Sequence, residues 1–465
     1  MRHVQANKIH LLLSFFLLSA TAHAQQIAFV NVNVVPMDKE QILSNQTVLV
    51  TNGRITAIGK TEKIKIPKAT KRINGTGKYL MPGLADIHVH IGYRPVADTA
   101  TEVALVMFVA NGVTTVRNMW GHTPVIFDLK REIESGRKLG PQIFSTGPVT
   151  DGRPPFRRDA RIVESVEQAD SSIRSDKNEG YIAFKAVDNL TLMAFRAIMS
   201  SAKKYHLPVV GHVPNSVTLQ EALSLGMYSI EHFYGYRIAL QSDTSPYKGI
   251  MSIKNMDYID IMKIPEVVKQ TKVAGTWNCP TMVTSSLTDT FTDHDVDNWL
   301  QRPYVKYLSR AANWATEAKK RNSERSEEDK ARFVKRYHLH AKLIKLLSDN
   351  ECGLLIGSDA PKSFVPPGFS IFDELEIFVN AGLTPYQALR AATTEPARFL
   401  NKQHEFGRVA VGMRADLILL NGNPLEDIKN AAMREGVMVK GRWFTEDQLV
   451  NLLEQILAQY RRRCC

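Results

Sequence analysis

Cysteine is scarce in this chain, which has four cysteines in 465 residues. Cys279 and Cys352 lie far apart, and Cys464 and Cys465 are adjacent at the end of the sequence. So few cysteines at this spacing provide no disulfide framework for a chain of this size, and none shows the spacing of zinc ligands. We expect the adjacent pair in a terminal tail that could oxidise or link two chains, and we assign it no chemistry.

Long apolar runs are also missing, apart from one near the N-terminus. The basic Arg2 and Lys8 precede the apolar run Leu11–Ala20, and Ala22-His23-Ala24 then places small residues at its first and third positions. This pattern is typical of a cleaved secretory signal, and the run is too short to span a bilayer. We therefore predict that residues 1–24 are a signal peptide, that the mature protein is exported to the periplasm or secreted, and that it has no stable membrane insertion.

Acidic residues are outnumbered, and the formal net charge is +12, or +10 without the basic residues of the predicted signal. A basic balance can indicate a nucleic-acid or membrane-surface partner. Here the basic residues are mixed with acidic ones along the chain, as in 319–335, and Arg461-Arg462-Arg463 is the one pure run. We expect a solvated basic surface with no nucleic-acid site, a surface that would mildly favour anionic substrates.

Short β-rich runs lie near both ends of the chain. The first group falls within residues 25–80, where turn signals such as Asn52-Gly53 separate the runs, and the second falls within 403–445. The two groups can pair as one small sheet domain, which we predict as a β-sandwich formed from both chain ends. Residues 446–465 are expected to form a C-terminal helix and tail.

The stretch 81–402 alternates apolar strand-like runs with amphipathic helical ones, such as Leu192–Tyr205 and Phe372–Ala381. Such alternation predicts an α/β domain with a parallel sheet, either closed into a barrel or left open. Residues 238–349 break the rhythm, are mostly polar, and are predicted as a helical insertion over the mouth of the domain. The insertion is either part of the substrate pocket or a structural decoration. The predicted strands are Val113–Arg117, Gln142–Thr146, Tyr181–Lys185, Val209–His212, Ser229–His232 and Leu354–Asp359.

His88-Val89-His90 is the first group with the character of a metal site. Residues two apart on a strand point to the same side, so both imidazoles would project together. A lone His-x-His is weak evidence for a metal site, and His338-Leu339-His340 shows why. It lies in a charged helical stretch, where residues two apart do not share a face, and we discard it.

Three further ligand-type residues stand where apolar strands end. They are His212 after Val209-Val-Gly, His232 after Ser229-Ile-Glu, and Asp359 after Leu354-Leu-Ile-Gly-Ser. The carboxyl ends of barrel strands are where catalytic groups gather. Three such residues, added to a His-x-His, predict a metal site.

Lys185 ends the strand Tyr181–Lys185, where a buried ammonium would be costly. A protonated lysine only donates hydrogen bonds and cannot bind a metal. The neutral amine can react with carbon dioxide to give a carbamate, an anionic oxygen donor able to bridge two metals. A lysine that snorkels or pairs with an acid is the alternative. In the company of four histidines and an aspartate, we favour the carbamate.

These residues make the chain resemble the amidohydrolase superfamily, in its prolidase-like and imidazolonepropionase-like branch. The similarity covers nearly all of the chain after residue 24. The matching pieces are Pro82–His90, Phe184-Lys185, Gly211–Pro214, Ile230–His232, Gly357–Ala360, Glu374–Glu376, Ala381–Pro385, Ala388–Thr393, Pro396–Leu400 and Gly412–Leu417.

The resemblance implies a (β/α)₈ TIM barrel and a small β-sandwich. It also implies two divalent metal ions, one held by His88 and His90, the other by His212 and His232, with carboxylated Lys185 between them. Asp359 would bind the first ion and act as the catalytic acid–base group. A bound metal lowers the pKa of water, and this donor set suits zinc, although manganese or iron would also fit.

Substrate contacts are less well defined than the metal ligands. Asn118, Arg153 and Phe372 stand where related enzymes often have Asp, His and His. Arg153 is retained as a candidate contact, together with Tyr234 and Arg237, which follow His232. We expect a small-molecule amide or peptide as the substrate, and a homo-oligomer is possible.

The predicted reaction is hydrolysis of a C–N bond in an amide, cyclic amide or dipeptide by metal-activated water. Alternatives on the same site are an Xaa-Pro-type dipeptidase or carboxypeptidase, and a phosphotriester or lactone hydrolase. From another class, the chain could be a catalytically inactive exported binding protein.

Overall fold

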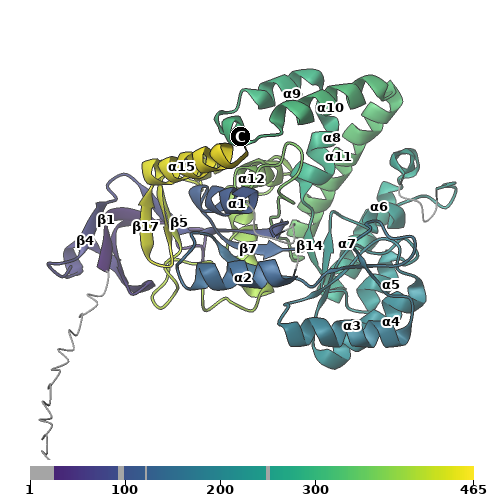
Figure 1. Cartoon of the computed structure of the whole chain (residues 1–465), viewed down its shortest axis with the longest axis horizontal. Helices are drawn as coiled ribbons and strands as arrows, with labels where there is room; N and C mark the ends of the chain where they lie inside the picture. The colour runs from purple at the N-terminus through teal and green to yellow at the C-terminus, as the bar shows by residue number, and fades with distance from the viewer. Residues whose placement is uncertain (1–25, 93–98, 121–122, 248–251, 465) are drawn as a thin grey trace, which may run out of the picture.

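A computed structural model describes residues 26–92, 99–120, 123–247 and 252–464 (Figure 1). The predicted signal at residues 1–24 lies outside these ranges. Within them, none of the helices combines the length and the apolar character that crossing a bilayer requires.

Strands from both ends of the chain share one eight-stranded sheet, seen at the left of Figure 1. Its order is β17-β16-β15-β5-β1-β2-β3, and β4 also pairs with β1. Late β15 pairs antiparallel with early β5, which places Leu417 opposite Pro82. This joins the two predicted β-rich groups in one sheet, while the two-layer packing of a sandwich stays a prediction. The strands are β1 (Gln26–Val34), β2 (Leu43–Thr51), β3 (Arg54–Lys60), β4 (Lys71–Asn74), β5 (Tyr79–Pro82), β15 (Leu417–Leu420), β16 (Arg434–Val439) and β17 (Arg442–Thr445).

The middle of the chain forms two parallel sheets. One has the order β6-β7-β8, and the other has the order β10-β9-β11-β12-β13-β14. Nearly every residue of these strands is buried, as expected for a parallel sheet covered on both faces. The strands are β6 (Leu84–Val89), β7 (Val113–Asn118), β8 (Gln142–Ser145), β9 (Val149–Asp151), β10 (Arg161–Ile162), β11 (Phe184–Ala186), β12 (Val209–Gly211), β13 (Ser229–Glu231) and β14 (Trp277–Cys279).

Hydrogen bonds join the two parallel sheets at both edges. On one side the N–H of Ile182, just before β11, donates to the carbonyl of Ser145 in β8. On the other side, the extended segment 354–360 lies between β14 and β6. The N–H of Leu355 donates to Asn278, and the carbonyl of Ile356 accepts from Ile87. This segment was expected as a strand, but its main chain makes single bridges instead of a regular ladder.

Helices alternate with these strands, and their ends follow local sequence. Ser165 and Gln168 form a capping box at the start of α3, and Gly180, at φ 86°, ends the same helix. The predicted helix Leu192–Tyr205 is α4. The α-helices are α1 (Thr99–Ala110), α2 (Thr123–Glu134), α3 (Val166–Glu179), α4 (Leu192–Tyr205), α5 (Leu219–Ser224), α6 (Tyr236–Ala239), α7 (Ile264–Ala274), α8 (Thr288–Thr290), α9 (Asp293–Leu300), α10 (Ala311–Glu324), α11 (Glu327–Asp349), α12 (Ser370–Asn380), α13 (Pro385–Ala391), α14 (Thr394–Phe399) and α15 (Glu446–Cys464). Shorter turns are the 3₁₀ segments Thr61–Lys63, Ile253–Tyr258, Ile261–Lys263, Pro303–Tyr307 and Ile428–Ala432, and the π-helix Val283–Leu287.

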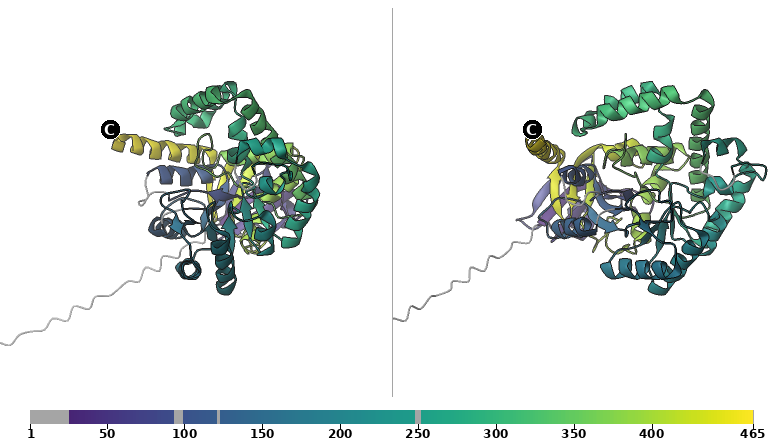
Figure 2. Two further views of the ribbon diagram at one scale, coloured as in Figure 1. Left: turned by 90° about the vertical axis from the view of Figure 1, so that its right-hand side faces the viewer. Right: turned by 45° about the vertical axis from the view of Figure 1, so that its right-hand side comes forward.

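The stretch 238–349, predicted as one helical insertion, contains a strand of the parallel sheet. Strand β14 pairs with β13 in this stretch, so the helices fall into a group before it and a group after it. The strand was missed because three residues are too few for a periodic pattern. Figure 2 shows the later helices α9 and α10, in green, at the top of both views, whereas α11 packs its buried residues against the main hydrophobic core.

Candidate functional site

His88 and His90 come from strand β6 and the residue after it. Their rings lie with centroids 5.3 Å apart, and His88 is completely buried. The Nε2 of His88 and the Nδ1 of His90 are buried without a hydrogen-bond partner among the described residues. Burial lowers the pKa of both imidazoles, to about 4 for His90. Neutral imidazoles with free nitrogens are what a metal ion requires.

His212 and His232 follow the next two parallel strands, β12 and β13. Their ring centroids are 5.1 Å apart, and His232 lies 4.7 Å from the ring of His88. The Nδ1 of His212 bonds to the carboxylate of Asp188, and the Nδ1 of His232 bonds to the hydroxyl of Thr281. These partners fix each ring and turn its other nitrogen toward the site.

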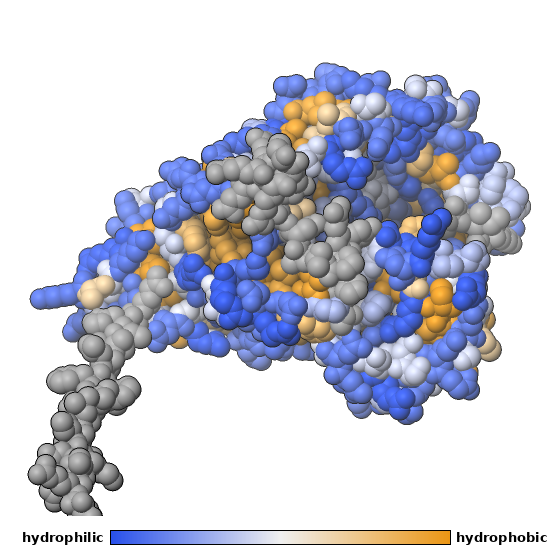
Figure 3. All heavy atoms as spheres, viewed as in Figure 1, coloured by the Kyte–Doolittle hydropathy of each residue, from blue (hydrophilic) through white to orange (hydrophobic). Residues whose placement is uncertain are grey.

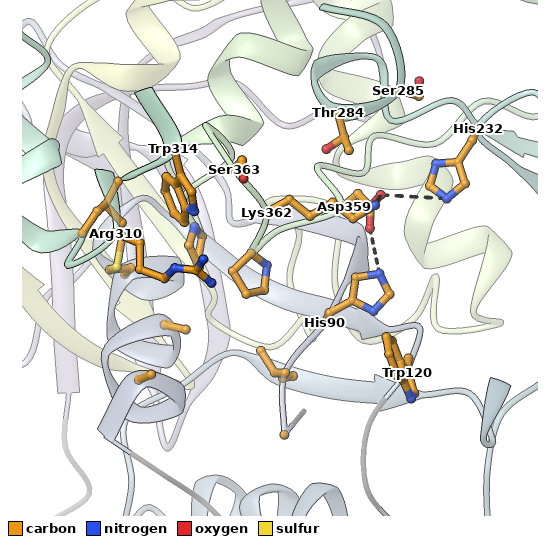
Figure 4. A pocket seen from close by; sticks show the side chains of 18 of the residues that line it. His90, Trp120, His232, Thr284, Ser285, Arg310, Trp314, Asp359, Lys362 and Ser363 are labelled. Atoms are coloured by element: carbon orange, nitrogen blue, oxygen red, sulfur yellow. Dashed lines mark hydrogen bonds and ion pairs between the residues drawn. The ribbon is translucent and has the colours of Figure 1, made fainter. Parts of the chain in front are cut away.

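Asp359 joins the histidines together. Its Oδ1 lies 2.7 Å from the Nε2 of His90 and 3.6 Å from the Nε2 of His88, while its Oδ2 lies 3.9 Å from the Nε2 of His232. Figure 4 shows the carboxylate between His90 and His232. Burial acts to raise the pKa of Asp359, but nearby Lys362, which pairs with it, and His88 outweigh burial and hold that pKa well below its usual range. Asp359 is therefore a carboxylate.

Lys185, in strand β11, lines the same cavity and is buried. No hydrogen bond or ion pair to its ammonium is found in the part of the chain that the structure describes. Burial lowers the pKa of Lys185 to about 8. A larger share of neutral amine is therefore present near neutral pH than for an ordinary lysine.

Two of these residues have a backbone conformation that is rare for side chains other than glycine. His232 has φ 58° and Asp359 has φ 64°, both in the left-handed region. Such conformations are typical of functional sites, where the surrounding structure holds them in place. Two residues before Asp359, Gly357 has no room for a side chain, because a Cβ there would lie 2.4 Å from the sulfur of Cys279 and 2.8 Å from the Cβ of His88.

A buried ion pair supports His88 from behind. Glu231 Oε2 lies 2.8 Å from the Nδ1 of His88, and the same carboxylate accepts from the guanidinium of Arg117 at 2.8 and 2.9 Å. Arg117 also donates to the carbonyl of Ile87 and to the hydroxyl of Ser229. The sequence pattern does not predict this ion pair, although Glu231 stands directly before His232.

Two further buried polar side chains hold the backbone next to Asp359 and His90. Asp86 accepts from the N–H and the hydroxyl of Ser358, next to Asp359, and burial raises the pKa of Asp86 to about 7. Asn118, which stands where an Asp is frequent, accepts from the N–H of Ile91 at 2.8 Å. It therefore positions the chain just after His90.

A cavity of about 1200 Å³ is lined by His90, Lys185, His212, His232 and Asp359, and His88 lies buried behind them. Tyr234 and Arg237 both line it, as predicted. The ring of Tyr234 stacks on that of His212 with centroids 3.9 Å apart and an interplanar angle of 14°. Arg237 is largely buried, and burial lowers its pKa to about 10. Figure 3 shows a mostly hydrophilic face, hollowed beneath the α9 and α10 helices.

Arg153 is not brought to this cavity. Its side chain is 69% exposed and lies 3.4 Å from the carboxylate of Glu164. The position of Arg153 in the sequence placed it after a strand, but the chain turns outward there. Phe372 does not line the cavity either and packs against the hydrophobic core.

The matching family model is the amidohydrolase family, over residues 79–444. The chain belongs to the amidohydrolase family. The matched range includes the four histidines, Lys185 and Asp359.

The similar proteins and structures include adenine deaminases, deacetylases and dipeptidases. Adenine deaminase of Staphylothermus marinus is 27% identical over 238 residues, which is 46% of this chain and 37% of that protein. The chain spans less than half the length of the curated deaminases that it matches. Among solved structures, bottromycin amidohydrolase has a TM-score of 0.72 at 22% identity, over 93% of this chain and 90% of its own. A Xaa-Pro dipeptidase with methionine bound in its active site has a TM-score of 0.66 at 20% identity, over 90% of this chain and 100% of its own. At such identity these structures show a shared fold.

Proposed function

We propose that this chain is a metal-dependent hydrolase that cleaves the C–N bond of a small amide, cyclic amide or dipeptide. The observation that carries the proposal is the convergence of three histidines, a lysine and an aspartate on one cavity, with His88 buried against them. The buried, unpartnered Nε2 of His88, which lies 3.6 Å from Asp359, points to a ligand that the protein itself does not supply.

The residues present fit two divalent metal ions. His88, His90 and Asp359 place ligand atoms within 4.8 Å of one another and would hold the first ion. His212 and His232 would hold the second, with Lys185, as a carbamate, between the two. Zinc suits this imidazole and oxygen set. When bound, the metals supply a nucleophilic water at neutral pH and polarise the scissile carbonyl.

The chain's own residues handle protons and orient the substrate. Asp359, a carboxylate in contact with His90, can accept the proton of the attacking water and hand it to the leaving nitrogen. Tyr234 and Arg237, on the wall beside His212, would bind a polar or anionic group of the substrate. The positive charge of Arg237 favours a carboxylate.

The proposal also covers the architecture of the domain, the export of the protein and the first substrates to test. The two parallel sheets and the segment 354–360 would together form a (β/α)₈ barrel, supported by the hydrogen bonds at both edges. The protein would be exported after removal of residues 1–24, and it could form a homo-oligomer. The similarity to a Xaa-Pro dipeptidase makes Xaa-Pro dipeptides a priority in substrate screening.

Substitution Asp359→Asn tests the proposal. Loss of the proton acceptor should lower kcat on any amide that the wild type cleaves by about 10²–10⁴-fold, the usual contribution of a general acid–base group. Metal content, measured by inductively coupled plasma mass spectrometry, should be largely retained. Asp297→Asn, at an exposed position on α9, is the control and should behave as wild type. Ligand binding without turnover in both wild type and Asp359→Asn would instead support an inactive binding protein.

A further inference from the structure

The cavity continues past the ligand-type residues along helix α1. Ala100, Val103, Ala104 and Met107 of this helix all line it. Spacings of three and four residues place these side chains on one face of the helix. None of the four carries a charge or a hydrogen-bonding group. The face of α1 toward the cavity is therefore mostly apolar, although Thr101 also lines the cavity, and we call its four apolar side chains the α1 stripe.

The opposite wall of this arm comes from segments far away in the sequence. Leu308, Trp314, Pro367 and Leu457 line it. Leu457 is in the C-terminal helix α15, which packs against α1 in a shared hydrophobic cluster with Val103. In Figure 4, Trp314 and Arg310 lie side by side at one side of the cavity, with Asp359 and Lys362 between them and His232. Arg310 is exposed and marks the end of the arm that opens to solvent. We call the space between the α1 stripe and this wall the apolar arm.

The charged residues beside the apolar arm, Lys306 and Arg310, are exposed, at the end that opens to solvent. Tyr234, Arg237 and Arg336 line the cavity on the side of His212 and His232. Asp359 is the one acidic residue among the lining residues that the structure describes. A substrate that fills the cavity is therefore polar or anionic near the histidines and apolar along the inner part of the arm.

The size of the cavity also favours a substrate with an extended apolar part. Its volume of about 1200 Å³ exceeds the roughly 300–1,000 Å³ usual for pockets that hold drug-sized ligands. A dipeptide or an acetylated amine would leave the apolar arm filled with water, in contact with apolar side chains. An apolar chain in the arm would release that water, and water release from apolar surface is favourable.

We propose that the substrate is an N-acyl amide with an extended apolar acyl chain, and that the apolar arm binds this chain. The inference rests on the proposed function, because it assumes that the scissile amide lies at the histidines. The amine side of the amide faces Tyr234 and Arg237, and the acyl side faces Ile91 and helix α1. The arm then selects substrates by chain length.

The experiment measures kcat/KM of the metal-loaded protein on N-acylglycines with acetyl, butyryl, hexanoyl and decanoyl chains. Each methylene that becomes buried should raise kcat/KM by about fourfold, which corresponds to about 0.8 kcal/mol. Because burial in the arm is incomplete at its open end, we expect a gain of at least about tenfold between acetyl and hexanoyl.

A matched pair of variants tests whether the rise of kcat/KM with chain length depends on the apolar arm. Ala104→Phe fills the arm from the α1 stripe and should lower the decanoyl-to-acetyl ratio of kcat/KM by at least about tenfold. Ala312→Phe makes the same change at an exposed position of α10, outside the cavity, and should keep the wild-type ratio. If Ala104→Phe does not fold, Leu457→Lys, at a half-buried position on the other wall, should lower the same ratio.

Binding separates this inference from the proposed function. Isothermal titration with decanoate and acetate should show decanoate bound more tightly by wild type, and this preference should be lost in Ala104→Phe or Leu457→Lys. That result supports the arm even if no N-acylglycine is cleaved. Equal kcat/KM for all chain lengths, together with no preference for decanoate, would overturn the inference while leaving amide hydrolysis intact. Decanoate preference that survives both variants would also overturn it.

Discussion

Replacement of Glu231 by Gln should weaken both folding and metal binding, because Glu231 connects the buried cation of Arg117 to His88, a proposed metal ligand. The carboxylate accepts hydrogen bonds from Arg117, Ser229 and His88, and the side chains of Glu231 and Arg117 are both 0% exposed. Gln keeps the size of the side chain but removes its charge, so the guanidinium of Arg117 would be buried without a counter-charge.

Both the stability and the affinity changes have an expected size. Breaking a buried pair by removing one partner costs about 3–5 kcal/mol, and complete burial means that no discount for solvent screening applies. Loss of the hydrogen bond that orients His88 should lower metal affinity by about 10–100-fold. The free energy of unfolding is measured by urea denaturation of the metal-free protein, and metal affinity by competition with a chelator.

The control is Glu132→Gln, which removes the acid of the exposed pair with Arg137 and should change neither quantity measurably. The reasoning fails if Glu231→Gln unfolds at the same urea midpoint as wild type. It also fails if the variant loses stability but binds metal with unchanged affinity, because Glu231 would then have no influence on His88.

Three further perturbations test separate parts of the structure. Burial raises the pKa of Glu374 from 4.5 to about 8, so the folded state binds this proton more tightly than the unfolded state. Its stabilising contribution is full below pH 4.5 and is lost as the pH rises to about 8. Glu374→Gln should therefore flatten the pH dependence of stability in that window, as followed by thermal unfolding. Arg237→Met should raise KM for anionic substrates, because Arg237 lines the cavity. Arg153→Met, at the exposed position, should leave steady-state kinetics unchanged. Equal effects of the two substitutions would contradict a role for Arg237 in binding the substrate. Gly357→Ala should lower the free energy of unfolding by about 1–3 kcal/mol, as overpacking does, and an unchanged melting temperature would show that the close contact with His88 relaxes freely.

The clustering of the candidate metal ligands was predictable because each lies in or after a run whose strand pattern is visible in the sequence. His88 and His90 share a face through the two-residue period of a strand, and His212 and His232 mark strand ends, whereas Asp359 ends an extended segment that the sequence predicts as a strand. The carboxyl ends of parallel strands meet at one edge of a sheet, so residues far apart in the chain could be assigned to one site without coordinates.

The supporting groups could not be found in the same way. Arg117 and Glu231 are 114 positions apart, and no local pattern pairs a buried arginine with a particular carboxylate. Asp188 likewise contacts His212 only because strands β11 and β12 are neighbours in register. Arg153 was placed incorrectly because the sequence shows where a strand ends but not the direction that the following loop takes.

Some elements of the fold were also predictable from the sequence, and others were not. The long helix Leu192–Tyr205 and the pairing of the chain ends follow from periodicity and turn residues. Strand β14, with three residues, has no period to detect, and the segment 354–360 makes isolated bridges that depend on its neighbours. The apolar arm was also invisible, since it brings α1 against residues more than two hundred positions away.

Metal content per chain, measured by inductively coupled plasma mass spectrometry on wild type and Lys185→Ala, tests the central claim most directly. Lys320→Ala, at an exposed position of α10, is the control. The account predicts about two divalent ions in wild type and in the control, and fewer in Lys185→Ala, as for a bridged two-metal site. About one ion in all three proteins would contradict the bridging role of Lys185, and no ion after reconstitution with zinc, manganese or iron would contradict the metal-dependent hydrolase itself.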